Sequence, residues 1–405
     1  MDMIAPCIRW VSIIWGYILR LFGQTKAADL PSDIVVDIFS RLPAELVFQC
    51  RDGSRMISTL TTSSSFIKMH LNRATSIIVL QYAVVFETLN FRKGIYESHV
   101  PLCFIDEENK KIVKRRLQVS FSCTFEDRWP LLLFQSCNGL LMFENRSVVV
   151  IWNPITQEHT IIDIPDSSYV CGFYFHEKTG DYKVVCVRKL KKSLKLIIIS
   201  ILTGSSKQTT WFSQPPHPKA PVILNGLLHW MVWGEPYGRT KCTTLKSSGS
   251  IFSFDVDSEN IRTIARPTGK NDRPMLLDFV HLLKKEGFLC FCDVTSCTYI
   301  DIWILEDYEA EVWIKLQRIS LDFLSSSNWK YTVYPLRALR MDKDELIVRW
   351  QNILYRYNLR QNIAKKVEMR GTEELPGYYM LLHTNSLVSP HTDNILSFDS
   401  PSGTK

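Results

Sequence analysis

The sequence predicts an α+β multidomain protein, in which a small N-terminal helical module precedes a mainly-β, β-propeller-like domain. Between residues 30 and 72, apolar residues recur at the spacing of amphipathic helices. From about Thr75 onward, short runs with period-2 alternation and turn residues between them take over. We therefore divide the chain into an unassigned apolar leader at 1–29, a helical module at 30–72 and the propeller-like domain at 75–405.

The helical module begins and breaks at prolines. Pro31 suits a first helical turn, where its missing N–H costs nothing, and Pro43 ends the first helix. Apolar stripes on the predicted helices include Ile34, Val35, Ile38, Leu42, Val47, Ile57 and Leu60. About 40 residues of short helices bury too little surface to be stable alone. We expect the apolar side chains of these stripes to pack against the rest of the chain or against another protein.

The propeller prediction depends on a recurring unit of an apolar strand, a polar turn and a second strand. Copies recur about every 40 to 55 residues, the range of four-stranded propeller blades. The copies are 149–162, 197–211, 251–264, 300–313 and 353–367, with a truncated one at 395–399.

A second recurring feature is a Gly-containing turn followed by an apolar run, at Asn138-Gly139, Asn225-Gly226 and Glu286-Gly287. Asn-Gly supplies the positive φ of a tight turn. We expect each blade to pair a turn and an apolar inner strand with an outer alternating hairpin. Six or so units would close a ring with few exposed edges, whereas an open β-sandwich is the alternative.

Composition narrows the functional classes. The net charge of +7 on 405 residues is modest, and basic runs such as Lys114-Arg115-Arg116 are typical of solvated hairpin ends. A nucleic-acid partner is not expected, because no coherent basic face or binding motif accompanies them. The eleven cysteines lack regular spacing and sit in apolar runs, which indicates buried free thiols in a reducing compartment. A metal site at Cys290, Cys292 and Cys297 is the alternative to core packing.

The leader contains an apolar run from Trp10 to Leu19, bounded by Arg9 and Arg20. Ten residues are short of the roughly 20 that span a bilayer. Residues 3–22 could form an interfacial membrane helix, a helix packed on the body, or a poorly ordered leader. We prefer the last two.

No catalytic constellation is apparent. The chain has no G-x-S-x-G, H-E-x-x-H, G-x-G-x-x-G or P-loop motif, and its nine histidines lack ligand spacing. We expect no catalytic residue, no metal and no cofactor. Trp152, Trp230, Trp303 and Trp313 are expected in the blade core, and Asn153, Asp255 and Asp399 in turns.

The helical module resembles an F-box, the short helical unit that docks a Skp1-type adaptor in a cullin-based ubiquitin ligase. The resemblance is carried by Leu30, Pro31, Asp33, Ile34, Ile38, Arg41, Leu42, Pro43, Val47, Arg51, Leu60, Phe66, His70 and Leu71. It implies adaptor docking through Leu30, Pro31, Ile34, Val35, Ile38, Leu42, Pro43, Val47, Arg51, Ile57 and Leu60. The chain departs from the pattern at Gly53, which would cost about 1 kcal/mol inside a helix, and at Ile57, where plant members carry Trp.

The second part resembles the F-box-associated domain of plant proteins, which is propeller-like and related to kelch repeats. The matching motifs, in family order, are 136–141, 151–154, 179–185, 224–230, 252–255 and 302–305. Together the two resemblances imply a non-catalytic substrate receptor of a Skp1–cullin–F-box ubiquitin ligase, located in the cytoplasm, the nucleus or both. The alternatives are a propeller interaction module with a degenerate, non-docking F-box, and a propeller-type enzyme or sugar-binding protein.

Overall fold

The computed structural model describes residues 31–83, 89–90, 95–106, 111–122, 129–191, 193–211, 216–217, 219–232, 250–267, 279–296, 298–324, 336–350, 353–367 and 379–391. The described part of the chain begins with four helices: α2 (Ser32–Ser40), α3 (Ala44–Arg51), α4 (Arg55–Thr62) and α5 (Ser64–Arg73). Pro31 and Pro43 stand immediately before α2 and α3. Ser54 and Ser63 cap α4 and α5, since each side-chain oxygen accepts a bond from a backbone N–H three residues on.

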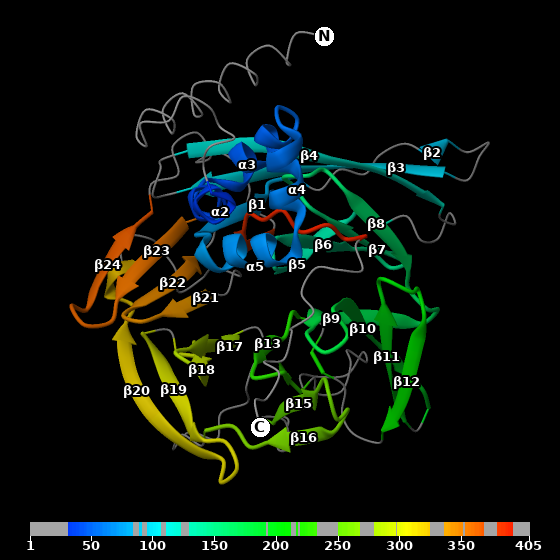
Figure 1. Cartoon of the computed structure of the whole chain (residues 1–405). Helices are drawn as coiled ribbons and strands as arrows, with labels where there is room; N and C mark the ends of the chain where they lie inside the picture. The colour runs from blue at the N-terminus through cyan, green and yellow to red at the C-terminus, as the bar shows by residue number, and fades with distance from the viewer. Residues whose placement is uncertain are drawn as a thin grey trace, which may run out of the picture.

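The strands form six antiparallel blades arranged around a central axis, as predicted (Figure 1). From the axis outward, blade 1 contains β25 (Tyr379–Thr384), β1 (Ser76–Gln81), β3 (Ile95–Asp106) and β4 (Lys111–Ser122), and the short β2 (Leu89–Asn90) also pairs with β3. Blade 2 contains β5 (Leu132–Cys137), β6 (Leu140–Glu144), β7 (Val148–Trp152) and β8 (His159–Asp163). Blade 3 contains β9 (Ser168–His176), β10 (Asp181–Lys189), β11 (Leu194–Ser200) and β12 (Ser206–Trp211).

Blades 4 to 6 repeat this plan. Blade 4 contains β13 (Val222–Leu224), β14 (Leu227–Met231), β15 (Ile251–Asp255) and β16 (Ile261–Ile264). Blade 5 contains β17 (Val280–Lys285), β18 (Phe288–Asp293), β19 (Tyr299–Asp307) and β20 (Val312–Ser320), followed by the 3-10 turn η3 (Asp322–Leu324). Blade 6 contains β21 (Arg337–Asp342), β22 (Glu345–Trp350), β23 (Ile353–Asn358) and β24 (Ile363–Lys366).

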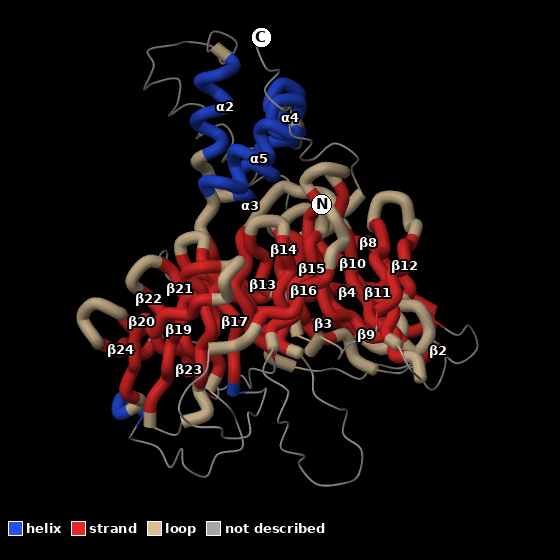
Figure 2. The backbone as a smooth tube through the Cα atoms, turned by 90° about the horizontal axis from the view of Figure 1, so that it is seen from below, coloured by secondary structure: helices blue, strands red, loops and turns tan. Residues whose placement is uncertain are grey.

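Blade 1 closes the ring with strands from both ends of the described chain. The late strand β25 pairs antiparallel with β1 along its whole length, from Ser76 opposite Thr384 to Gln81 opposite Tyr379. This pairing covers the edge of β1 that faces the axis, which an open ring would leave unpaired. Because α5 runs directly into β1, the same blade carries the helices. Figure 2 shows all four helices on one face of the ring.

The Gly-containing turns lie between the first and second strands of blades 2, 4 and 5. Both residues of each turn have positive φ, for example 49° at Asn138 and 86° at Gly139. The innermost strand therefore precedes the turn, and the apolar run after it is the second strand, which corrects the predicted inner strand. The recurring hairpins are the third and fourth strands, as predicted. Their third strand is not simply alternating, because all five residues of β7 are buried.

The same geometry recurs in several blades at the turn between the third and fourth strands. Asp307 of blade 5 accepts bonds from the backbone N–H groups two and three residues later. In blades 2, 4 and 6 the side-chain oxygen of Asn153, Asp255 or Asn358 does the same. The residue four positions on, Gln157, Glu259 or Asn362, has positive φ. Its N–H donates to the backbone carbonyl of the Asn or Asp at 2.9 Å. Asn153 and Asp255 are thus turn residues, as predicted, and the predicted repeat at 395–399 with Asp399 lies outside the described residues.

The core is a set of apolar clusters between neighbouring blades. Separate clusters join blades 1 and 2, 3 and 4, 4 and 5, 5 and 6, and 6 and 1. Trp152 and Trp230 are 1% and 2% exposed within two of them, whereas Trp303 and Trp313 are partly buried beside a third. Cys290 and Cys292 are fully buried free thiols, and burial raises the pKa of Cys290 to about 12. No His, Cys, Asp and Glu group of metal-binding geometry occurs among the described residues.

Candidate functional site

The helical module is held together by polar contacts as well as by its core. Asp37 of α2 pairs with Arg41 at 3.1 Å and with Arg73 of α5 at 2.8 Å. His70 Nε2 lies 2.8 Å from the carbonyl oxygen of Leu42. These contacts tie α5 back to α2 across the module, so the four short helices behave as one packed unit.

The predicted adaptor-docking residues fall into groups of different exposure. Val35, Val47 and Ile57 are at most 2% exposed, so they hold the helices together and are not available at the surface. Arg51 donates two hydrogen bonds to Thr61, at 3.1 Å and 2.6 Å, and thereby joins α3 to α4. Leu30 lies outside the described residues. The remaining predicted residues form what we call the docking surface: Pro31 and Pro43 are exposed, and Ile34, Ile38, Leu42 and Leu60 are partly buried.

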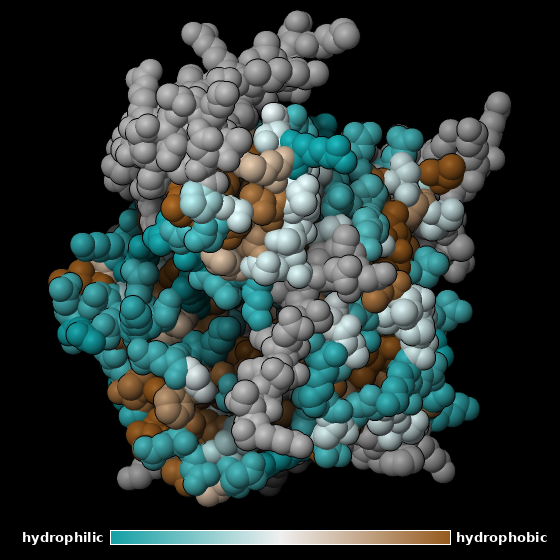
Figure 3. All heavy atoms as spheres, viewed as in Figure 1, coloured by the Kyte–Doolittle hydropathy of each residue, from teal (hydrophilic) through white to brown (hydrophobic). Residues whose placement is uncertain are grey.

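Among the partly buried side chains of the docking surface, Ile34 packs least against the core of the module. Ile38, Leu42 and Leu60 pack against the buried cluster of the module, whereas Ile34 is not part of that cluster. Met56, on α4, is a further apolar side chain near the module surface, with 39% exposure. Figure 3 shows apolar side chains among hydrophilic ones on the part of the surface formed by the helices. This mixture leaves apolar area that a partner could cover.

The two departures from the F-box pattern have structural explanations. Gly53 lies in the turn between α3, which ends at Arg51, and α4, which begins at Arg55. The predicted helix-interior cost at Gly53 is therefore wrong. Ile57 is 0% exposed and fills the centre of the module. Its side chain contributes to folding of the module rather than to an exposed aromatic contact.

A polar mount fixes the module to the propeller. The Glu45 carboxylate of α3 lies 3.5 Å from an Arg115 guanidinium nitrogen of β4 and accepts a 3.1 Å bond from the Asn385 side chain. Arg115 also donates to the backbone carbonyl of Pro154 in blade 2. Glu45 and Arg115 are both mostly buried, with side-chain exposures of 24% and 23%. The contacts thus connect α3 to blades 1 and 2 and to the segment after β25.

That segment, residues 385–388, runs between the helices and blade 2, and we call it the strap. Asn153 donates to the Ser386 and Val388 carbonyls at 3.1 Å and 2.6 Å. Leu387 and Val388 are buried in one continuous apolar cluster with residues of the helices and of blades 2 and 3. Gly139 lies so close that a Cβ there would stand 1.9 Å from Ser386 Oγ. The strap therefore seats the module on the ring.

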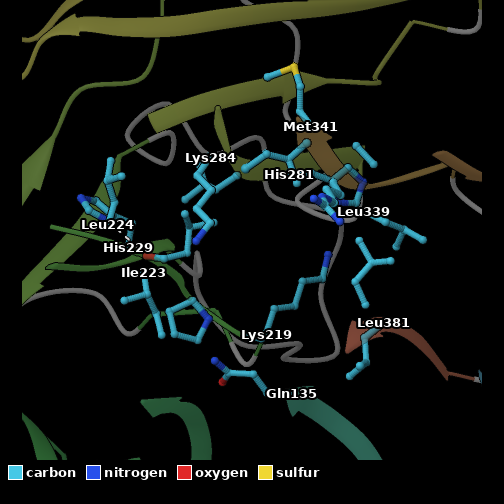
Figure 4. A pocket seen from close by; sticks show the side chains of 18 of the residues that line it. Gln135, Lys219, Ile223, Leu224, His229, His281, Lys284, Leu339, Met341 and Leu381 are labelled. Carbon is cyan, nitrogen blue, oxygen red and sulfur yellow. Dashed lines mark hydrogen bonds between the residues drawn. The ribbon is translucent and has the colours of Figure 1, made fainter. Parts of the chain in front are cut away.

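The second candidate site is the central channel, a cavity of about 950 Å³. Residues of the innermost strands β5, β13, β17, β21 and β25 line it, together with residues 217 and 219–221. Figure 4 shows the Lys219 and Lys284 side chains reaching into the cavity. Its charged lining residues are Lys219, Lys284, Arg337, Arg340, Glu286 and Asp342. The lining is therefore more cationic than anionic.

His229 lines the channel, and its pKa is lowered because the side chain is buried. Burial lowers the pKa of its imidazole to about 4. One ring nitrogen lies 3.2 Å from the Val222 carbonyl and the other 2.9 Å from the Tyr308 hydroxyl. The Tyr308 hydroxyl also lies 2.7 Å from the Ser253 hydroxyl. With both ring nitrogens engaged inside blades 4 and 5, His229 is a satisfied core residue.

Sequence reasoning missed the mount and the channel cations. Arg115 was assigned to a solvated hairpin end, yet it is largely buried. The available signal was alternation, because Arg115 shares a strand face with Leu117 and Val119, which are both buried. Lys284 comes just before the Glu286-Gly287 turn, which marks the end of an innermost strand. That signal becomes usable only when the strand order within a blade is known.

A six-bladed propeller with a four-helix module seated on one face defines the class of this protein. The model of the F-box associated beta propeller domain matches residues 93–389, and the chain belongs to that family. Similar Arabidopsis thaliana proteins include F-box/kelch-repeat protein At4g19930, 23% identical with 84% of this chain and 85% of that protein covered. F-box protein At3g07870 is 27% identical, with 80% and 77% covered, and F-box protein CPR1 is 24% identical, with 71% and 72% covered.

Proposed function

We propose that this protein is the substrate receptor of a Skp1–cullin–F-box ubiquitin ligase. In this proposal the docking surface binds a Skp1-type adaptor, and through it a cullin, while the propeller holds a target protein. The observation that carries the proposal is the helical module itself. It is fixed to the ring by the mount and the strap, yet leaves Pro31, Ile34 and Pro43 accessible at its surface.

The proposed mechanism is proximity. A receptor that holds its target near a charged ubiquitin carrier raises the effective concentration of the acceptor lysines, with no bond made or broken by the receptor. This requires a fixed geometry between the two binding regions. The mount of Glu45, Arg115 and Asn385 supplies such a geometry, because it joins α3 directly to the ring. In this proposal the chain is a non-catalytic subunit.

The rival function of a non-docking module loses part of its physical support. Its argument used Gly53 as a helix-weakening residue, and Gly53 lies between helices. No helix among the described residues is long and apolar enough to cross a membrane. The leader, including residues 3–22, lies outside the described residues. As part of the proposal, we place the receptor in the cytoplasm, the nucleus or both.

Adaptor docking is tested by co-purification of a Skp1-type adaptor with the full chain carrying Ile34→Asp. A charge at this partly exposed, weakly packed position should abolish adaptor recovery while leaving the fold intact. The matched control is Ile363→Asp on β24, which is 49% exposed and belongs to blade 6. It should leave adaptor recovery unchanged. Equal adaptor recovery with both variants, each with the melting temperature of the unmodified protein, would contradict the docking proposal.

A further inference from the structure

The cationic residues of the central channel are not balanced by its acids. The two carboxylates of the lining already have partners: Glu286 pairs with Lys285 at 2.7 Å, and Asp342 pairs with Arg340. The side chains of Lys284 and Arg337 have no hydrogen bond or ion pair with another described residue. Lys219 adds a third cation to the lining. The Lys284 and Arg337 side chains therefore bring positive charge into the lining that no carboxylate among the described residues pairs with.

Arg337 is placed at an electrostatic cost. It stands directly opposite Arg349 in the register of β21 and β22, and like charges directly opposite each other destabilise a sheet. Burial, together with the smaller effect of the Arg337 charge, lowers the pKa of Arg349 to about 10. An anion bound beside Arg337 would reduce this repulsion.

The positions of these residues along the axis indicate which mouth of the channel carries the charge. Ser76, directly after the helices, pairs with Thr384, so β25 ends at the face that carries the module. The Asn138-Gly139 turn contacts Ser386 at that same face, and the innermost strands end there. Arg337 begins β21 and therefore lies toward the opposite face. His217, whose N–H donates to the Met231 carbonyl, places the neighbouring Lys219 toward that face as well.

We propose that the channel mouth opposite the helices binds an extended acidic segment of the target protein, with Arg337 and Lys219 at the entrance and Lys284 deeper inside. This inference rests on the proposed receptor function and names the chemistry by which the target is held. Cations at different depths suit a chain with several carboxylates better than a single charge. A volume of about 950 Å³ is at the upper end of small-molecule pockets, so it also accommodates a few residues of peptide.

The location favours a target segment as the occupant. A protein bound at the mouth opposite the helices does not compete with a partner on the docking surface, since the ring lies between them (Figure 2). Charge complementarity of this kind raises the association rate and sets specificity, and it weakens with added salt. A small polyanion such as tripolyphosphate would meet the same cations, and the experiment below distinguishes it.

The test uses the full chain in complex with a Skp1-type adaptor, or alone if none binds. Fluorescence polarisation is measured with two labelled octapeptide mixtures, one with Asp or Glu at alternate positions and one with Asn or Gln there. The acidic mixture should bind and the amide mixture should not. The double variant Lys284→Gln with Arg337→Gln should weaken binding by about tenfold or more, since two charge-assisted contacts are lost. Lys365→Gln on the outer strand β24 is the matched control and should change affinity by less than about twofold.

Arg337→Gln also separates a binding role from a structural one. Removing the charge opposite Arg349 should maintain or raise the melting temperature while peptide affinity falls. No binding of the acidic mixture, or equal binding by the double variant, would overturn the inference. So would tripolyphosphate binding without peptide binding, because the site would then be a small-anion site. Adaptor recovery is scored separately, so loss of peptide binding with normal adaptor recovery rejects this inference and leaves the receptor function standing.

Discussion

Glu45 and Arg115 form an ion pair of 3.5 Å that joins the helical module to the propeller. The pair is mostly shielded from water, and Asn385 completes it with a 3.1 Å bond to the same carboxylate oxygen. Burial lowers the pKa of Arg115, and the Coulombic attraction of Glu45 opposes that shift. The arrangement makes the orientation of the helices a property of the whole ring.

The first prediction concerns this mount. Glu45→Ala should lower the free energy of unfolding by about 1 to 3 kcal/mol, because Arg115 is left partly buried without its carboxylate. Chemical denaturation measures the change. Lys207→Ala is the control, since it breaks an exposed pair with Glu259 and should cost less than about 1 kcal/mol. Equal losses in both variants would show that the mount adds no more than a surface pair.

The second prediction separates backbone strain from close packing at Gly139. Its φ is 86°, and an added Cβ would overlap Ser386 in the strap. Gly204 also has positive φ, at 65°, but a Cβ there would meet nothing within 4 Å. Gly204→Ala should therefore cost about 1 kcal/mol of stability from conformation alone. Gly139→Ala should cost several times more and should also reduce adaptor recovery, because the strap is displaced. Similar thermal shifts for the two variants would contradict the close approach.

The third prediction concerns Ile57, where the related pattern has Trp. Because Ile57 is 0% exposed, Ile57→Trp should overpack the module and destabilise it by about 1 to 3 kcal/mol. It should not improve adaptor binding. Met56→Trp, one residue away and 39% exposed, is the matched control and should be tolerated. A rise in adaptor affinity in Ile57→Trp without loss of stability would argue that the module repacks around an aromatic side chain.

The fourth prediction is a pH dependence at Glu144. Burial raises the pKa of this β6 carboxyl to about 7, so the folded state holds its proton at pH values where the unfolded chain has released it. The stabilising effect of the neutral form is complete below about pH 4.5 and is lost as the pH rises through 7. The free energy of unfolding of Glu144→Gln, taken relative to that of the unmodified protein, should therefore be larger at pH 8 than at pH 5. The expected increase is on the order of 2 kcal/mol. A gain of the same size at both pH values would reject the assignment.

The propeller was predictable from the sequence because each blade repeats local chemistry. The turns at Asn-Gly and at Asn153, Asp255 and Asn358 require particular residues at fixed offsets. Such residues can be recognised in the sequence without any knowledge of the ring. The strand order within a blade was predicted less well, since an apolar run can belong to any strand buried on both faces.

The docking surface was predicted only in part. Helical periodicity identifies an apolar face, but it does not say which neighbour covers that face. Val35, Val47 and Ile57 are buried by the protein itself, whereas Ile34 is only partly buried and lies outside their cluster. The mount could not be foreseen because Glu45, Arg115 and Asn385 are far apart in sequence and meet only through the closed ring.

Ring closure by β1 and β25 has a consequence for how the protein is made. Thr384 is synthesised 308 residues after its partner Ser76. The helices therefore leave the ribosome long before the strap that holds them on the ring has been made. Until the strap arrives, the apolar residues that face Leu387 and Val388 have no cover, and β1 has an unpaired edge. A nascent or prematurely terminated chain would therefore carry the module without its fixed orientation. Strand β25, the last of the described strands, thus links synthesis of the ring to the fixed orientation of the helices.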